Sequence, residues 1–267
     1  MKAAHPEAVP IAGGTDVMVE INLDHKRPDT VVDLTRIADL AEWATEDGLV
    51  RVGAGVTYAR IIDELGDRMP GLAMASRTVG SPQIRNRGTV GGSVAHADPA
   101  AEMPGIAVTC DAEITVIGAA GPRVIRADDF FIAPLTTALA ADEIITEIRL
   151  PAWPAQRRWG FREFSRRRGD FAMAAAAVFF DVDDAGKAHN THIGAIGIGD
   201  RPVRLADAEA EVNGKVVDVA VSERAGRAAS ASVTPQSDIH ASGAYRKSLL
   251  GTMVERALQS AAGLPCR

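Results

Sequence analysis

Two glycine-rich segments carry the residue types best suited to binding an anion. Residues 80–93 read Gly-Ser-Pro-Gln-Ile-Arg-Asn-Arg-Gly-Thr-Val-Gly-Gly-Ser, with four glycines, two arginines and no regular apolar period. Glycine lets a backbone come close to another group and accepts a positive φ. Successive free N–H groups can then form a concave nest for phosphate. A plain glycine-rich turn explains the same composition.

The second segment lies near the start of the chain and reads Ile11-Ala-Gly-Gly-Thr-Asp-Val17. A strand-like entry, two glycines and the candidate N-caps Thr15 and Asp16 predict a turn that opens a helix, an arrangement that binds phosphate. Neither segment has the pattern of a Rossmann loop or a P-loop. Together they suggest one extended phosphorylated cofactor that is clamped from two sides.

Composition excludes several other classes of function. The 267 residues allow one large or two modest domains, and 46 % apolar residues suffice for a sizeable core. A net charge of −6 argues against a general binder of nucleic acid or of a membrane surface. The start lacks the apolar core of a secretory leader, and no apolar run is long enough to span a membrane. We therefore expect a cytoplasmic protein.

No catalytic triad, paired-carboxylate site or metal cluster stands out in the sequence. Cys110 and Cys266 are too few for a disulfide framework or an iron–sulfur cluster, and Cys110 is expected to be buried and inert. His189 and His192 form the only close histidine pair, which we expect in a solvated turn rather than at a metal. The chain is thus expected to hold a cofactor that does the chemistry.

Strands alternate with helices in the first part of the chain, which predicts a small α/β unit. Thr30–Leu34 and Val50–Ala54 are rich in β-branched residues between turn residues and are expected to be strands. Helices are expected over Thr57–Leu65, with Thr57 as N-cap, and over Pro99–Thr109, with Asp98 as N-cap.

From Ala112 the apolar period changes to two, which predicts an antiparallel α+β part. The prolines within residues 151–158 mark the best domain boundary. The expected strands are 113–117, 123–125, 144–150, 160–165, 172–182 and 191–198, and the expected later helices are 206–212, 218–231 and 241–262.

Motifs along nearly the whole chain resemble those of a known family, the FAD-binding medium subunits of the molybdenum hydroxylases, to which carbon monoxide dehydrogenase and xanthine dehydrogenase belong. The matching motifs occur in the same order in this sequence: Ala12-Gly-Gly-Thr-Asp16, Pro28-Asp-Thr-Val-Val-Asp-Leu34, Val52-Gly-Ala-Gly-Val-Thr57, Gln83-Ile-Arg-Asn-Arg-Gly-Thr-Val-Gly-Gly92, Asp98-Pro-Ala-Ala-Glu102, Asp142-Glu-Ile-Ile145, Phe161-Arg-Glu-Phe-Ser-Arg-Arg167 and Ala244-Tyr-Arg246.

The resemblance implies an α+β fold in two parts. A PCMH-type FAD-binding domain is expected over residues 1–152, with subdomains of about 1–55 and 56–152. A small α+β flavoprotein domain of the carbon monoxide dehydrogenase type is expected over 159–264. Family members also place a helix and a strand before the first glycine loop, so one wall of the first subdomain is expected to be thinner here.

The resemblance also implies a complex of three polypeptides, arranged as a dimer of heterotrimers. A molybdopterin-carrying large subunit oxidises the substrate, and a small subunit with [2Fe-2S] clusters relays single electrons. The FAD of the medium subunit passes them to an external acceptor. Alternatives are a stand-alone FAD-dependent oxidase and a non-catalytic assembly protein of the same fold.

Because two glycine loops are available for a pyrophosphate and neither contains a cysteine, we predict one FAD per chain, held without a covalent bond. His96 is the only nearby residue able to form such a bond. Val79 and Ile145 are equally well explained as ordinary core, and Glu102 as a charge that complements a helix dipole. Valine-sized substitutions of Gly13 or Gly91 are expected to empty the site while the fold survives. The implied cofactor-binding residues are Ile11, Ala12, Gly13, Gly14, Thr15, Asp16, Val17, Val79, Thr89, Val90, Gly91, Gly92, Ser93, His96, Glu102, Ile145 and Arg162.

The densest basic cluster comprises Arg162 and Arg166–Arg168. It is either a solvated face or part of a surface for a partner or an electron acceptor.

Overall fold

The computed structural model describes residues 2–265; Cys266 lies outside them. An antiparallel sheet of five strands forms the centre of the N-terminal part, in the order β3-β4-β9-β5-β6. Its apolar side chains alternate along the strands, as in β9, where Ile148 and Leu150 are buried. The strands are β3 (Trp43–Glu46), β4 (Leu49–Gly53), β5 (Glu113–Gly118), β6 (Gly121–Arg126) and β9 (Ile144–Pro151).

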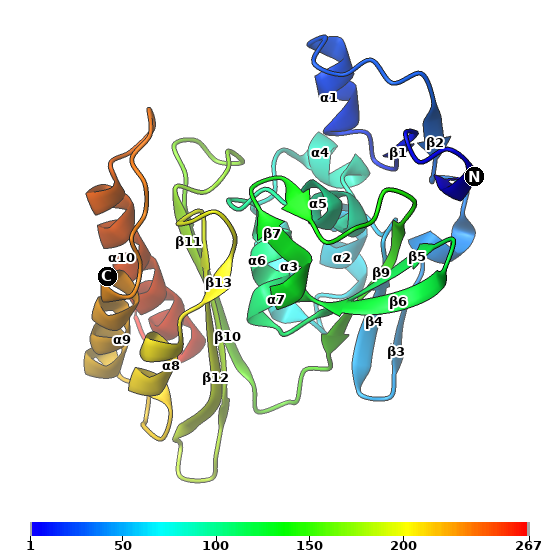
Figure 1. Cartoon of the computed structure of the whole chain (residues 1–267). Coiled ribbons are helices and arrows are strands. Elements are labelled where there is room, and N and C mark those ends of the chain that lie inside the picture. Colours follow the sequence, from blue (N-terminus) through cyan, green and yellow to red (C-terminus); the bar gives the residue numbers. More distant parts are fainter. Residues whose placement is uncertain (1, 266–267) are drawn as a thin grey trace.

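Short helices fill the space between this sheet and the C-terminal part (Figure 1). Thr57 caps α2 by accepting a hydrogen bond from the Arg60 N–H, as the sequence predicted. The helices are α2 (Tyr58–Glu64), α3 (Pro70–Ser76), α4 (Pro82–Arg87), α5 (Val90–His96), α6 (Glu102–Thr109) and α7 (Ala127–Phe130). A small hairpin of β7 (Phe131–Ala133) and β8 (Thr136–Thr137) follows α7.

A separate small unit precedes the five-stranded sheet. Strands β1 (Val9–Ile11) and β2 (Val31–Asp33) pair in parallel, and α1 (Val17–Asn22) connects them. Two 3-10 helices, Lys2–Ala4 and Ala38–Ala41, flank the unit. A subdomain boundary was expected near residue 55. The central sheet contains strands from both sides of this residue, since β3 and β4 precede it and β5, β6 and β9 follow it.

The C-terminal part is a four-stranded antiparallel sheet with helices on its outer face (Figure 1). Its other face packs on α3 and α6, so one hydrophobic core contains both central-sheet residues and Phe161, Phe179 and Ile196. The elements are β10 (Arg158–Phe164), β11 (Ala174–Val182), β12 (Ala188–Ile196), β13 (Val203–Arg204), α8 (Ala206–Val212), α9 (Val219–Ala231) and α10 (Gly243–Ala261).

Three local predictions were wrong. Most of the segment 80–93 is helical, in α4 and the start of α5, because Ser81 and Thr89 act as N-caps. Helix α6 begins at Glu102, with Ala101 as N-cap. His192 lies on β12 and is buried against Phe179, not in a solvated turn.

Candidate functional site

The first glycine segment presents a row of unused hydrogen-bond donors. Gly14 has φ = 75°, a backbone conformation that glycine adopts without cost, and it turns the chain from β1 into α1. Within the described residues, the N–H groups of residues 13–17 have no protein acceptor. Asp16 occupies the N-cap position of α1 without making a side-chain cap bond. This loop can therefore direct several N–H groups at an anion.

The second segment uses its donors internally. The N–H groups of Val90 and Gly91 bond to the carbonyl oxygens of Val56 and Ala54, at 3.0 and 2.9 Å. The Gly92 N–H bonds to Thr89 Oγ1 at 3.1 Å. The start of α5 is thus fixed to the central sheet and forms a wall of the site rather than an open nest.

The two segments lie in contact although they are far apart in the sequence. A Cβ atom on Gly13 would overlap the carbonyl group of Arg87, and Arg87 Nε donates to the Gly13 oxygen at 3.4 Å. His96 Nδ1, at the end of α5, lies 3.5 Å from a carboxylate oxygen of Asp16. The fold thus brings together residues 13–16 and 87–96.

An exposed strip of α5 next to the first loop leaves room for a ligand. Gly92 and His96 are one helical turn apart and therefore share a face. Gly92 is exposed, and a Cβ there would meet only Thr89 Oγ1, at 3.0 Å. Unused N–H groups near Gly92, a helix position without a side chain, fit the pyrophosphate of a dinucleotide cofactor.

Gly91 has a different role from the one expected. A Cβ atom there would lie 2.8 Å from the Ala54 carbonyl oxygen and closer still to the Ala54 side chain. Any larger residue must therefore push α5 away from Ala54, the residue that follows β4. The expectation that a Gly91 variant keeps the fold and loses only the ligand does not fit this packing.

The residues expected around the flavin ring are more scattered. Ile145 is buried in the central core, and Val79 is half-buried against that core. Glu102 starts α6 and is close to Thr78. Arg162 lies on β10, on the face that packs against α10, since the adjacent Gly160 and Phe164 contact Ala257 and Tyr245 of that helix. The side chain of Arg162 therefore points away from the other candidate residues.

The neighbouring residue, Glu163, faces the site instead. Trp159, on the same face of β10, packs against Gly71 of α3. Burial and the nearby charge of Glu163 raise the pKa of Glu102 to about 8, and burial also raises the pKa of Glu163. Sequence reasoning missed Glu163, although the period of two in β10 placed it opposite Arg162.

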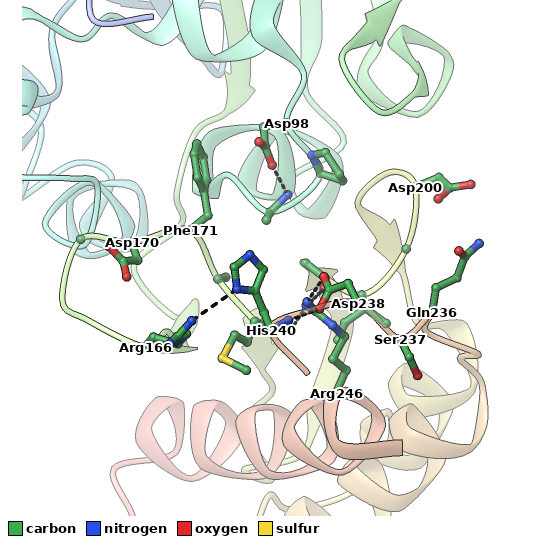
Figure 2. A pocket seen from close by; sticks show the side chains of 18 residues that line it. Asp98, Arg166, Asp170, Phe171, Asp200, Gln236, Ser237, Asp238, His240 and Arg246 are labelled. Carbon is green, nitrogen blue, oxygen red and sulfur yellow. Dashed lines mark hydrogen bonds and ion pairs between the residues drawn. The ribbon is translucent and has the colours of Figure 1, made fainter. Parts of the chain in front are cut away.

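A cavity of about 750 Å³ lies between the loop after β10 and the segment before α6. Figure 2 shows Asp98 and Phe171 on one side and His240, Asp238 and Arg246 on another. Phe171 is 57 % exposed, and Arg166 reaches His240 Nδ1 at 3.5 Å. None of the predicted cofactor residues lines this cavity. The motif Ala244-Tyr-Arg246 supplies one wall residue, Arg246, which is fixed by Asp238 at 2.6 Å.

Comparisons with known proteins agree with this architecture. Residues 1–153 match the model of the FAD-binding domain in molybdopterin dehydrogenase, and residues 159–261 match that of the CO dehydrogenase flavoprotein C-terminal domain. The nicotine 6-hydroxylase medium subunit of Paenarthrobacter nicotinovorans is 36 % identical, over 94 % of this chain and 88 % of the relative.

Solved structures give the same result. Quinoline 2-oxidoreductase from Pseudomonas putida 86 superposes with a TM-score of 0.92 at 33 % identity, over 98 % of this chain and 91 % of its own. Carbon monoxide dehydrogenase from Hydrogenophaga pseudoflava gives 0.91 at 31 % identity, over 96 % and 90 %. The chain belongs to the FAD-binding medium subunits of the molybdenum hydroxylases, the family of carbon monoxide dehydrogenase and xanthine dehydrogenase.

Proposed function

We propose that this chain binds one FAD without a covalent bond and transfers electrons within a complex. In this proposal the electrons come from a small subunit with [2Fe-2S] clusters and originate at a molybdopterin-carrying large subunit. They leave through FAD to an external acceptor. The observation that carries the proposal is the loop at residues 13–17. Its N–H groups have no acceptor within the described residues, and its Asp16 lies 3.5 Å from His96 of α5.

Each part of the site has a separate task in this proposal. Backbone N–H groups of the first loop bind the pyrophosphate, because oriented peptide dipoles favour negative charge. Helix α5 supports them, since Tyr58, buried beneath it, donates a hydrogen bond to Ser93 Oγ at 2.6 Å. Val79, Glu102 and Glu163 surround the region expected to hold the flavin ring.

Bound FAD supplies redox chemistry, because a flavin can accept single electrons and deliver them in pairs. The sequence has two cysteines, fewer than the four thiolates that a [2Fe-2S] cluster needs. Electrons must therefore reach the flavin across an interface with another chain. The exposed arginines 166–168 are our candidate for part of such an interface.

The binding claim is tested on the purified chain. We expect one FAD per polypeptide, and acid precipitation should leave the yellow chromophore in the supernatant. Colour retained in the pellet would show a covalent bond, for which His96 is the nearest candidate. A colourless protein that also fails to take up added FAD would refute the proposal.

A further inference from the structure

The carboxyl groups of Glu102 and Glu163 share a neighbour, Thr78, at the junction of the two domains. Glu102 is the first residue of α6 in the N-terminal part, and Glu163 lies on β10 in the C-terminal part. Trp159 and Phe161, on the same face of β10 as Glu163, pack on α3 and in the core of the N-terminal part. Glu163 therefore points into the interface, beside the region expected to hold the flavin ring.

Few donors are available to these two groups. Thr78 Oγ1 lies 3.3 Å from Glu102 Oε1, but the same hydroxyl also lies 2.8 Å from the Ala75 carbonyl oxygen. A hydroxyl carries one proton, so it can donate to only one of these acceptors. The Thr78 hydroxyl is also within hydrogen-bond reach of Glu163, and the backbone N–H of Glu102 is a further donor to the Glu102 carboxylate. Glu163 Oε2 is buried and has no hydrogen-bond partner within the described part of the chain.

Within residues 2–265, neither carboxyl group forms an ion pair with a basic side chain. The negative charges of Glu163, from β10, and Asp98, from the loop before α6, both act on Glu102. The Tyr58 hydroxyl, from α2, is neutral, because burial and the charge of Glu102 both raise its pKa. Two ionised carboxylates without a cation in a buried site are strongly unfavourable, and such pairs hold a proton.

We propose that Glu102 and Glu163 share one proton at neutral pH and take up a second one when the bound flavin is reduced. This inference rests on the proposed function, because it requires FAD beside the pair. A bound flavin that accepts two electrons and one proton would gain one negative charge. That charge would draw a second proton from solvent to the carboxyl pair, so two protons would enter for two electrons.

In this proposal Glu163 is a positioning residue, because it acts on the flavin through Glu102. Replacing Glu163 by Gln removes one carboxylate and keeps the shape of the side chain. Glu102 then has one negative neighbour fewer and ionises at lower pH than in the parent, although burial, the largest cause, still raises its pKa. The variant should therefore take up fewer protons than the parent for two electrons near neutral pH.

The experiment counts protons directly. The flavin of the holoprotein is photoreduced in weakly buffered solution between pH 6.5 and 7.5, and a pH-indicator dye reports the protons taken up. Glu163→Gln and Glu102→Gln are compared with the parent and with Glu42→Gln, an exposed control. We expect two protons in the parent and control, and fewer than two in both site variants. Equal uptake in all four proteins would overturn the inference while leaving FAD binding established.

A second readout needs no flavin. Infrared spectra of the FAD-free protein at pH 7 should contain the C=O stretch of a protonated carboxylic acid. This band should be weaker in Glu163→Gln and retained in Glu42→Gln. A spectrum without this band in the parent would overturn the shared proton. If the band is present but the protein never binds FAD, the proposed function is wrong. The uptake of a second proton on flavin reduction is then ruled out as well, while the shared proton stands.

Discussion

Replacing Gly13 by alanine should push the two glycine-rich segments apart and weaken FAD binding. The new Cβ atom would lie 2.7 Å from the carbonyl carbon of Arg87 and closer still to its oxygen. Arg87 belongs to helix α4, which is held by its N-cap Ser81. Residues 13–17 are partly exposed, and their N–H groups make no main-chain hydrogen bonds within the described residues. We therefore expect the first loop to move.

The size of the effect follows from the cost of overpacking. Inserting a methyl group where none fits costs about 1–3 kcal/mol, which corresponds to a loss of about 5- to 150-fold in affinity. The assay is a titration of the FAD-free protein with FAD, followed by the quenching of flavin fluorescence. The melting temperature should change little, because Gly13 is only partly buried and lies in the loop between β1 and α1.

Gly160→Ala is the matched control. A Cβ atom at this buried position would lie 2.8 Å from the carbonyl carbon of Ala257 in α10, nearly the same overlap as at Gly13. It lies on the face of β10 away from the site, so it should lower the melting temperature and leave FAD affinity unchanged. Parent-like FAD affinity in Gly13→Ala, or an equal loss in both variants, would refute the clamp.

Three further predictions concern stability and assembly. Because the pKa of Glu102 is raised from 4.5 to about 8, the folded FAD-free protein keeps a proton that the unfolded chain releases, so its free energy of unfolding should fall as the pH rises between these values. Glu102→Gln should remove up to about 5 kcal/mol of that fall, measured by urea unfolding at pH 5 and 8.5. The same pH dependence in the variant and the parent would contradict the burial argument. Tyr58→Phe leaves Ser93 Oγ without its donor and should cost about 1 kcal/mol of stability, measured by the same unfolding assay; a variant as stable as the parent would show that the bond contributes nothing. Replacing Arg166, Arg167 and Arg168 by Glu should weaken assembly with the partner subunits, more at low salt, because exposed charges are screened within about 10 Å at 0.1 M; parent-like assembly in sedimentation would mark the cluster as a solvated face.

Local signals predicted the elements of this fold well. The cap at Thr57 and the helix over Ala206–Val212 are confirmed, because polar caps and apolar periods act over a few residues. The segment 80–93 was misread as a loop because its glycines outweighed the caps at Ser81 and Thr89. Strand β3 and helix α3 were not predicted, and both are held by packing rather than by strong local signals.

The site was only partly visible in the sequence. The contact between Gly13 and Arg87 was anticipated as two segments around one ligand, but the fixed donors of α5 were not. That Glu163 rather than Arg162 faces Glu102 depends on which face of β10 meets the N-terminal part. A period of two separates the faces of a strand but does not say which one is covered by which neighbour.

The central claim is that FAD in this chain receives electrons from partner subunits, and one measurement tests it most directly. The chain is reconstituted with the iron–sulfur and molybdopterin subunits encoded by the same organism, and substrate of the large subunit is added without oxygen. We predict that the flavin absorbance bleaches only when all three subunits are present, and that the isolated chain shows no turnover. Bleaching of the isolated chain by substrate, or no bleaching in the assembled and substrate-competent complex, would contradict the account.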